Sequence, residues 1–233
     1  MLSTFLQTAV DAVEMTPVQE ELSFSLISMA AKGGWLMLVL LALSIVAIYI
    51  FGKKWWSIRQ AGHIDKNFIK DVDNYLAEGK VRSARALCKR SDTPVARMIE
   101  KGVERIDKPL SDIRIAVENV ANVEVAKLEK GLPALATIAG GAPMIGFLGT
   151  VMGMVQAFFN MAQAGNNIDI TLLSGGIYTA MITTVGGLIV GILAYFGYNY
   201  LTAQVTSLVA KMEASSIEFL DAAQARKDSK TQE

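Results

Sequence analysis

The sequence has one cysteine, one histidine and a formal net charge of zero, and each scarcity excludes a class of protein. A lone Cys88 cannot form an internal disulfide or a multi-cysteine metal site, so we expect it to pack as a small apolar side chain. His63 stands in a polar turn, where a solvated side chain is expected. Zero net charge provides no attraction for nucleic acid. With no phosphate-binding loop, metal-ligand cluster or nucleophile–base pair, the sequence predicts neither an enzyme nor a cofactor.

Charge is also missing from long stretches of the chain. The region from Gly131 to Ala210 contains one charged residue, Asp169, which lies beside two asparagines and marks a turn between two apolar runs. Apolar residues mixed with Gly, Ala, Ser and Thr are typical of helices packed together in a bilayer. A further run from Gly33 to Gly52 has 20 uncharged residues, about 30 Å of helix, which matches a hydrocarbon core. Three membrane-spanning helices are therefore predicted.

The polar residues gather between the first and second runs. Most of the lysines and arginines lie between Lys53 and Lys130. Because basic segments stay on the cytoplasmic side, we expect this block inside, the N-terminus outside and the C-terminus inside. Residues 1–32 lack the basic start of a cleavable signal and are expected outside the membrane or in its interface. A buried helix of a soluble domain is the alternative for the first run, but its length and continuous apolarity disfavour it.

Short amphipathic helices are expected within the polar block. One is indicated by apolar residues at helical spacing, Ile64, Phe68, Val72 and Leu76, and Gly79 can end it. Thr93 and Pro94 form an N-cap and N1 pair for a second helix.

A last helix of the block is expected after Pro109, with Ser111 as its cap. We expect it to run without interruption towards the membrane. Its apolar face is predicted to be core or a contact with a neighbouring subunit, and comprises Ile113, Val117, Val120, Val123 and Leu128.

Together these features predict an all-α membrane protein of seven segments. The second apolar run exceeds one bilayer core and should tilt or project inward, and Pro133 and Pro143 could kink or divide it. The predicted segments are an N-terminal periplasmic or interfacial segment 1–32, span 33–52, cytoplasmic helical domain 53–130, span 131–160 with a cytoplasmic extension, periplasmic loop 161–169, span 170–201 and C-terminal cytoplasmic helix 202–233.

Small and hydroxyl residues distinguish the second and third spans. Rows of glycines at spacings of three and four let helix backbones approach closely, namely Gly146, Gly149 and Gly153 in one span and Gly187 and Gly191 in the other. The threonines of these spans, Thr150, Thr183 and Thr184, could simply bond their own backbone one turn back. A proton relay needs a titratable group at membrane depth, and no span interior has one. Either the chain passes no protons or a partner supplies that group.

Two stretches resemble a known family. PMIGFLGTVMGM, from Pro143 to Met154, is similar to the PxxGLLGTVxGM stretch of the MotA/TolQ/ExbB proton-channel proteins. The third span, GGIYTAMITTVGGLIVGILAY, resembles that family's GIxEALxTTAxGLxVAIPA pattern. The KGGWLM opening of the first span and the order of three spans around one cytoplasmic block fit the ExbB and TolQ branch. The resemblance extends over roughly residues 22 to 215.

The resemblance implies a homopentamer in the bacterial inner membrane, surrounded by lipid and enclosing a dimer of single-span ExbD-like partners. The partner's transmembrane Asp would supply the missing group, and Thr150 and Thr184 would line the proton path beside it. In the ExbB branch, proton flow energises outer-membrane import through a TonB-like transducer. The alternatives are a TolQ-like subunit for envelope integrity or division, another motor such as a gliding motor, and a non-conducting scaffold for a single-span partner.

The sequence departs from the family pattern at two positions. Thr179 stands where many relatives carry Glu, so a role of that carboxylate cannot be transferred, although the hydroxyl can still hydrogen-bond. Leu193 stands where relatives have Pro, which argues against a kink there. Thr179 and Thr183 join Thr150 and Thr184 as candidate residues of the proton path.

Overall fold

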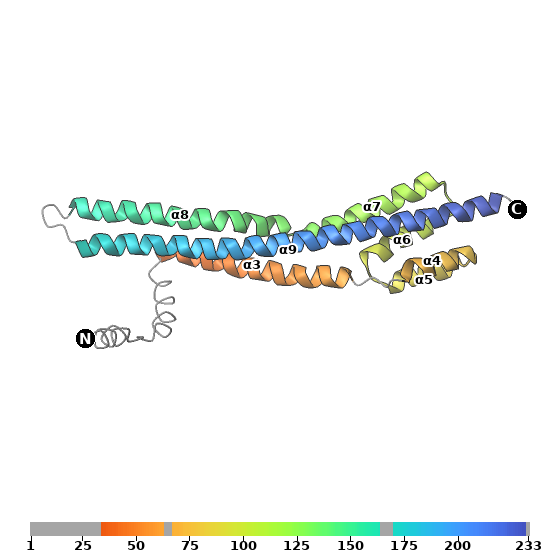
Figure 1. Ribbon diagram of the computed structural model, residues 1–233, viewed down its shortest axis with the longest axis horizontal. Helices are drawn as coiled ribbons and strands as arrows, with labels where there is room; N and C mark the ends of the chain where they lie inside the picture. The colour runs from red at the N-terminus through yellow and green to blue at the C-terminus, as the bar shows by residue number, and fades with distance from the viewer. Residues whose placement is uncertain (1–33, 63–66, 164–169, 232–233) are drawn as a thin grey trace, which may run out of the picture. The chain divides into compact units, whose positions relative to one another are not determined.

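The computed structural model describes residues 34–62, 67–163 and 170–231, and their regular secondary structure is entirely α-helical. His63 and Ile64 lie outside the described residues, as does most of the predicted loop 161–169. The helices, labelled in Figure 1, are α3 (Gly34–Ala61), α4 (Phe68–Ala77), α5 (Val81–Arg90), α6 (Pro94–Glu104), α7 (Leu110–Glu129), α8 (Leu132–Gln163) and α9 (Ile170–Thr231).

Three stretches of helix are long and apolar enough to cross a membrane. They lie in Gly34–Ala61, in Leu110–Gln163, which includes α7 and α8, and in Leu173–Asp228 of α9. Within the most apolar 18 residues of each stretch, the share that is buried inside the chain is only 17%, 22% and 33%, respectively. Since large apolar side chains such as Phe147 and Phe196 are exposed, these helices offer apolar surface to lipid or to other chains. The prediction of an all-α membrane protein with three apolar helical stretches is therefore confirmed.

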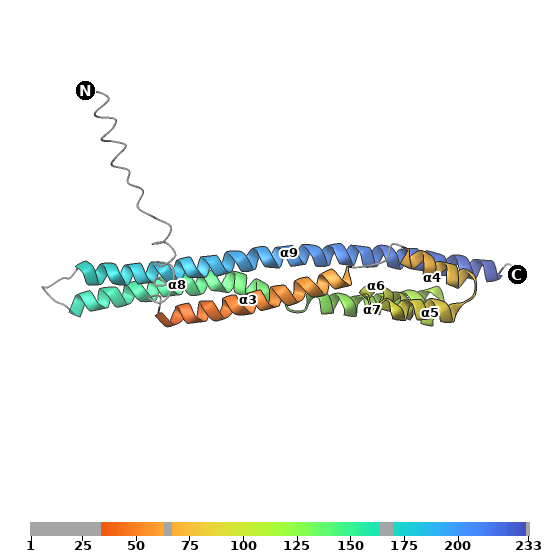
Figure 2. The same ribbon diagram turned by 90° about the horizontal axis from the view of Figure 1, so that it is seen from below.

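Contacts divide the chain into two units, and α3, α8 and α9 contribute to both. The first unit holds Gly141–Gly191 with the chain up to Leu43, and the second holds Ser44–Gly140 with Ile192–Glu233. In the first, α8 and α9 run side by side, as Figures 1 and 2 both show.

The second unit is a helical domain with a dense apolar core. Helix α4 buries Phe68, Val72 and Leu76, as its spacing predicts, and Gly79 follows its end with φ +73°. Thr93 caps α6, where its hydroxyl accepts the Ala96 N–H at 3.3 Å, which confirms the predicted cap. The core is completed by side chains of α6, α7 and α9 that are almost fully buried, among them Val95, Met98, Ile99, Val103, Ile113, Val117, Met212 and Phe219.

The predicted cap at Ser111 is wrong. Helix α7 begins at Leu110, and Pro109 occupies the N-cap position without a side-chain cap. The Pro109 carbonyl accepts the N–H groups of Asp112 and Ile113 at 3.0 and 3.2 Å, so the chain is already helical at Ser111. On the predicted face of α7, Ile113, Val117 and Leu128 are buried, Val120 is half-buried, and Val123 is exposed and free for a neighbour.

The expected uninterrupted run into the membrane is also wrong. Helix α7 ends at Glu129, and Gly131 adopts φ +96°, a left-handed conformation that favours glycine, before α8 begins at Leu132. The Lys54 ammonium donates to the carbonyls of Lys127 and Leu128 at 2.9 and 3.3 Å. This side chain therefore satisfies carbonyls that the last turn of α7 leaves without helical partners.

Helices α8 and α9 are continuous where a break was conceivable. Pro133 lies in the first turn of α8, where its missing N–H costs nothing, and α8 passes through Pro143 without dividing. Helix α9 likewise passes through Leu193 and covers both the predicted third span and most of the predicted C-terminal segment.

Candidate functional site

Helices α8 and α9 approach each other closely at two facing glycines. A Cβ added to Gly187 would lie 2.6 Å from the Ala142 carbonyl oxygen and 2.9 Å from Gly146 Cα. A Cβ added to Gly146 would lie 2.8 Å from the Thr183 carbonyl oxygen. Because these neighbours are backbone atoms, they cannot move aside without separating the helices. The absence of side chains here brings the two backbones into van der Waals contact.

Two of the other predicted packing glycines, Gly149 and Gly153, extend this seam. A Cβ on Gly153 would lie 2.6 Å from Ala180 Cβ, and one on Gly149 would lie 2.8 Å from Thr183 Cβ. Gly191 is buried on α9.

Sequence reasoning missed two glycines in the first unit. A Cβ on Gly176 would lie 2.7 Å from Ala157 Cβ, and one on Gly186 would lie 3.1 Å from the Met37 sulfur of α3. The spacing could have revealed Gly176, since eleven residues separate it from Gly187, about three helical turns.

Three threonine hydroxyls gather around the seam at the Gly146 carbonyl oxygen. This oxygen lies 3.0 Å from the hydroxyl of Thr184, 3.4 Å from that of Thr183 and 3.5 Å from that of Thr150. In return, the Thr150 hydroxyl of α8 donates to the Ala180 carbonyl of α9 at 3.1 Å. The hydroxyl oxygens of Thr150 and Thr184 also lie within hydrogen-bonding distance of each other, and because each hydroxyl has one proton, a bond between them takes the place of one of these bonds to a carbonyl. The two side chains therefore join α8 to α9 reciprocally, each through the backbone of the other helix.

The four candidate threonines differ in their surroundings. Thr150 and Thr184 are half-buried, so their hydroxyl pair lies at the edge of the helix pair. Thr183 is buried and donates to the Ala180 carbonyl one turn back at 2.7 Å, the ordinary structural role of a helix threonine. Thr179 is half-buried, and the described residues provide no hydrogen-bond partner for its hydroxyl. The structure thus brings Thr150 and Thr184 together and leaves Thr179 one turn away.

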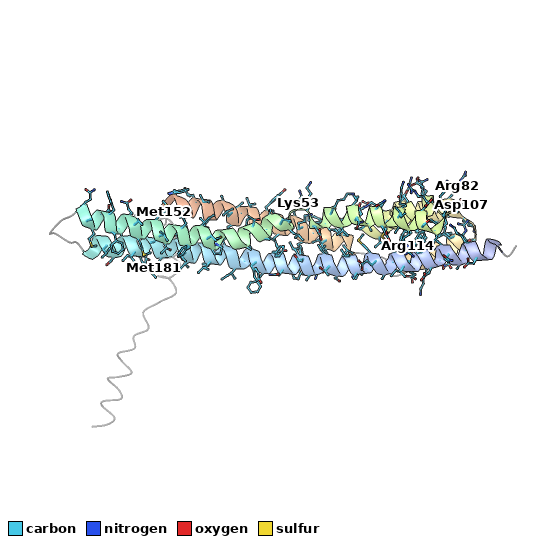
Figure 3. All side chains as sticks on the ribbon, turned by 90° about the horizontal axis from the view of Figure 1, so that it is seen from above. Lys53, Arg82, Asp107, Arg114, Met152 and Met181 are labelled. Carbon is cyan, nitrogen blue, oxygen red and sulfur yellow. The ribbon has the colours of Figure 1, made fainter. Side chains whose placement is uncertain are left out.

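Around this hydroxyl pair the helices carry no charge. Residues 141–163 and 170–191 contain no Asp, Glu, Lys, Arg or His, and no group of three such metal-binding side chains occurs among the described residues. Exposed side chains nearby are apolar, including Met152 of α8 and Met181 of α9, labelled in Figure 3. A threonine hydroxyl can donate or accept a hydrogen bond but does not titrate near neutral pH. The pair can orient a proton-carrying group but cannot be one.

The second unit contains an ion cluster that sequence reasoning missed. The Glu124 carboxylate, 4% exposed, accepts from Arg97 at 2.7 Å and from Lys127 at 2.6 Å, and Arg97 also pairs with Asp92. Burial alone would raise the pKa of Glu124, but the hydrogen bonds and charges of Arg97 and Lys127 outweigh it and lower the pKa. The cluster fastens α6 to α7 and is a structural element.

Three long apolar helical stretches, glycine-mediated packing and an uncharged interior define a multi-pass helical membrane protein. Comparison with known proteins narrows this class. The profile of the MotA/TolQ/ExbB proton channel family matches residues 90–214, more than half of the chain. The chain therefore belongs to the MotA/TolQ/ExbB proton channel family.

Individual relatives agree with this assignment. A biopolymer transport protein ExbB homolog from Methanothermobacter thermautotrophicus is 27% identical over 190 residues, 81% of this chain and 67% of that protein. An ExbB-like protein from Synechocystis is 28% identical over 174 residues, 74% of this chain and 68% of that protein. The biopolymer transport protein ExbB of Neisseria gonorrhoeae is 34% identical over 107 residues, 46% of this chain and 48% of that protein.

Proposed function

We propose that the chain is an ExbB-like subunit of a proton-driven motor in the bacterial inner membrane. Five copies enclose a dimer of single-span, ExbD-like partners, with the N-terminus outside and the C-terminus inside. Proton flow through this assembly energises outer-membrane import through a TonB-like transducer. The observation that carries the proposal is an uncharged α8–α9 wall with one hydroxyl pair at its edge, in a chain similar to proteins named ExbB.

The absence of charged residues from the apolar helical segments is the reason for proposing a partner chain. A proton crossing a bilayer needs a titratable group at membrane depth. Residues 34–52, 131–163 and 170–210 contain no Asp, Glu, Lys, Arg or His, so in this proposal a carboxyl group from another chain carries the proton. The half-buried Thr150 and Thr184 hydroxyls are the polar groups that such a carboxyl would meet on this wall.

The hydroxyl pair can exchange partners at low cost. A helical threonine populates two χ1 rotamers, because its hydroxyl can bond a backbone carbonyl in its own helix. Replacing one neutral hydroxyl bond by another changes the free energy by about 1 kcal/mol or less. Thr150 and Thr184 can therefore release the Ala180 and Gly146 carbonyls to solvate an ionised carboxylate, and return when that carboxylate is protonated. In this mechanism the wall lowers the barrier to proton transfer without binding the proton.

Removing the hydroxyls tests the assignment. Thr150→Val and Thr184→Val keep the side-chain shape and remove the donor, so the double variant should lower import through a TonB-dependent receptor at least about tenfold, the effect of losing about 1.4 kcal/mol of solvation. Thr206→Val is the matched control, because Thr206 bonds the Thr202 carbonyl of its own turn at 3.0 Å and lies outside the first unit.

The readout is uptake of a labelled substrate in cells that contain equal amounts of each variant, measured by immunoblot. Undiminished uptake in the double variant would contradict the role of the hydroxyls. If uptake then fell only on disruption of the packing glycines, the non-conducting scaffold would be the better account.

A further inference from the structure

A small pocket lies between α3 and α9 in the second unit. Its volume is about 230 Å³, and it is lined by Trp55, Ile58, Arg59, Tyr200, Leu201 and Gln204. Ile58 and Leu201 are buried and form an apolar base, whereas Trp55, Arg59, Tyr200 and Gln204 are exposed at the rim. The pocket thus combines an apolar base with a rim of aromatic and hydrogen-bonding side chains, and no acidic residue lines it.

Arg59 provides an available cation at the rim of this pocket. Its guanidinium carbon lies 5.3 Å from the centroid of the Trp55 ring, a cation–π arrangement. Among the described residues, Arg59 has no hydrogen-bond or ion-pair partner. Its N–H donors therefore remain available in the fork geometry that suits a phosphate.

The neighbourhood of the pocket is basic and aromatic. Lys53, labelled in Figure 3, lies 5.9 Å from the centroid of the Tyr49 ring, and Lys54 follows it directly. Trp56 is 73% exposed beside them. Exposed tryptophans and tyrosines next to lysines are typical of the level of lipid headgroups in a bilayer.

The position of the pocket along the helices agrees with this level. Arg59 follows the last residue of the uncharged run, Gly52, by seven residues, about 10 Å of helix. Tyr200 lies on α9 among the tyrosines that precede its first charged residue, Lys211. Both walls of the pocket therefore belong to the ends of apolar stretches.

We propose that this pocket binds the phosphate-bearing headgroup of an anionic phospholipid. The Arg59 guanidinium holds the phosphate, Gln204 and the Tyr200 hydroxyl are further donors at the rim, and Ile58 and Leu201 contact the glycerol and the first acyl carbons. Inorganic phosphate shares the anionic chemistry but leaves the apolar base uncovered. A lipid satisfies both halves of the site at once.

The test is lipid retention by the purified full-length chain in its native assembly. The protein is reconstituted in an equal mixture of phosphatidylcholine and phosphatidylglycerol, extracted in mild detergent and analysed by native mass spectrometry. The wild type should retain phosphatidylglycerol in preference to phosphatidylcholine, and Arg59→Gln should reduce that preference about fivefold, the factor expected for one basic side chain near the bilayer surface. Arg82→Gln is the control, since Arg82, labelled in Figure 3, is also exposed but lies on α5, away from the residues that line the pocket.

Two results would overturn the proposal. One is equal phosphatidylglycerol retention by the wild type and Arg59→Gln. The other is displacement of the retained lipid by excess inorganic phosphate, which would identify a phosphate site instead. If Arg59→Gln fails to assemble, Arg59→Lys takes its place, because it keeps the charge and loses the fork. It should retain less phosphatidylglycerol than the wild type, and equal retention would contradict the role of the guanidinium.

Discussion

Gly187→Ala should separate α8 from α9, because the added methyl group has no space. Its Cβ would lie 2.6 Å from the Ala142 carbonyl oxygen, whereas ordinary contacts begin at 3.4 Å. The helices would have to move apart by about 0.8 Å at this level. That movement would also lengthen the hydrogen bonds that Thr150 and Thr184 make across the seam.

The expected cost follows from two opposing effects. Overpacking of this kind typically costs about 1–3 kcal/mol. Alanine favours a helix over glycine by about 1 kcal/mol, which offsets part of that cost. We therefore expect Gly187→Ala to destabilise the folded protein by about 0–2 kcal/mol, which is about 1–3 kcal/mol worse than a glycine-to-alanine change in a helix that meets no neighbour. Gly175 is the matched control on the same helix, since no atom lies within 4 Å of its added Cβ, so Gly175→Ala should be neutral or stabilising.

The assay is thermal unfolding of the purified variants in the same detergent, followed by circular dichroism. For a chain of this length, 1 kcal/mol corresponds to about 2–4 °C in the unfolding midpoint. Gly187→Ala should unfold several degrees below Gly175→Ala, and Gly175→Ala should unfold at or above the wild-type midpoint. A midpoint for Gly187→Ala equal to that of Gly175→Ala would refute the close contact of the two backbones.

Three further predictions concern the second unit. Glu124→Gln should destabilise it by about 2 kcal/mol, because hydrogen bonds from Arg97 and Lys127 to a charged acceptor are lost, which urea unfolding measures. The pKa of Glu124 is lower in the folded state than its ordinary 4.5, so its stabilisation of the folded state is fully present above pH 4.5 and is lost as the pH falls through the folded pKa. Glu124→Gln should therefore weaken the dependence of stability on acid pH. A pH profile unchanged by Glu124→Gln would contradict this role of the carboxylate. Burial raises the pKa of the Cys88 thiol to about 12, so iodoacetamide should label the native protein about a thousandfold more slowly than the unfolded chain, and fast native labelling would refute its burial. Gly102→Ala should lower the unfolding midpoint, because its Cβ would lie 2.8 Å from Cζ of the buried Phe219 ring and closer still to Cε1, and a higher midpoint would show that the core rearranges to admit the methyl group.

Features set by composition over many residues could be predicted from the sequence. Uncharged runs of bilayer length identify the three apolar stretches, because charged side chains are costly in a bilayer and are therefore absent from the sequence of a span. Recognising such a run requires no knowledge of the tertiary structure. The start of α6 at Thr93 and Pro94 could also be predicted, because an N-cap hydrogen bond joins residues only three positions apart.

Features that depend on backbone conformation or distant partners were missed. Gly131 interrupts the chain through its left-handed φ, but in a region with many glycines nothing in the sequence distinguishes it from those inside helices. Ser111 was a plausible cap whose place Pro109 had already taken. The ion pair of Arg97 and Glu124 joins residues 27 positions apart, and only the packing of α6 on α7 brings them together.

The candidate site could be predicted only in part from the sequence. The family resemblance pointed to Thr150 and Thr184, and the structure joins their hydroxyls across 34 residues of sequence. It also adds a feature that side-chain motifs cannot encode, since the Gly146 carbonyl is the shared acceptor of the cluster. A glycine at that position serves both the close helix contact and the hydroxyls.

The most direct test of the account is proton flux in proteoliposomes with an imposed membrane potential, followed by a pH-sensitive dye. The purified chain alone should leak no more than empty liposomes, because residues 34–52, 131–163 and 170–210 contain no Asp, Glu, Lys, Arg or His. Addition of the single-span partner should produce flux, and exchange of that partner's transmembrane Asp for Asn should abolish it. Proton flux through the chain alone, or flux unchanged by the Asp-to-Asn exchange, would contradict the central claim that the proton-carrying group comes from another chain.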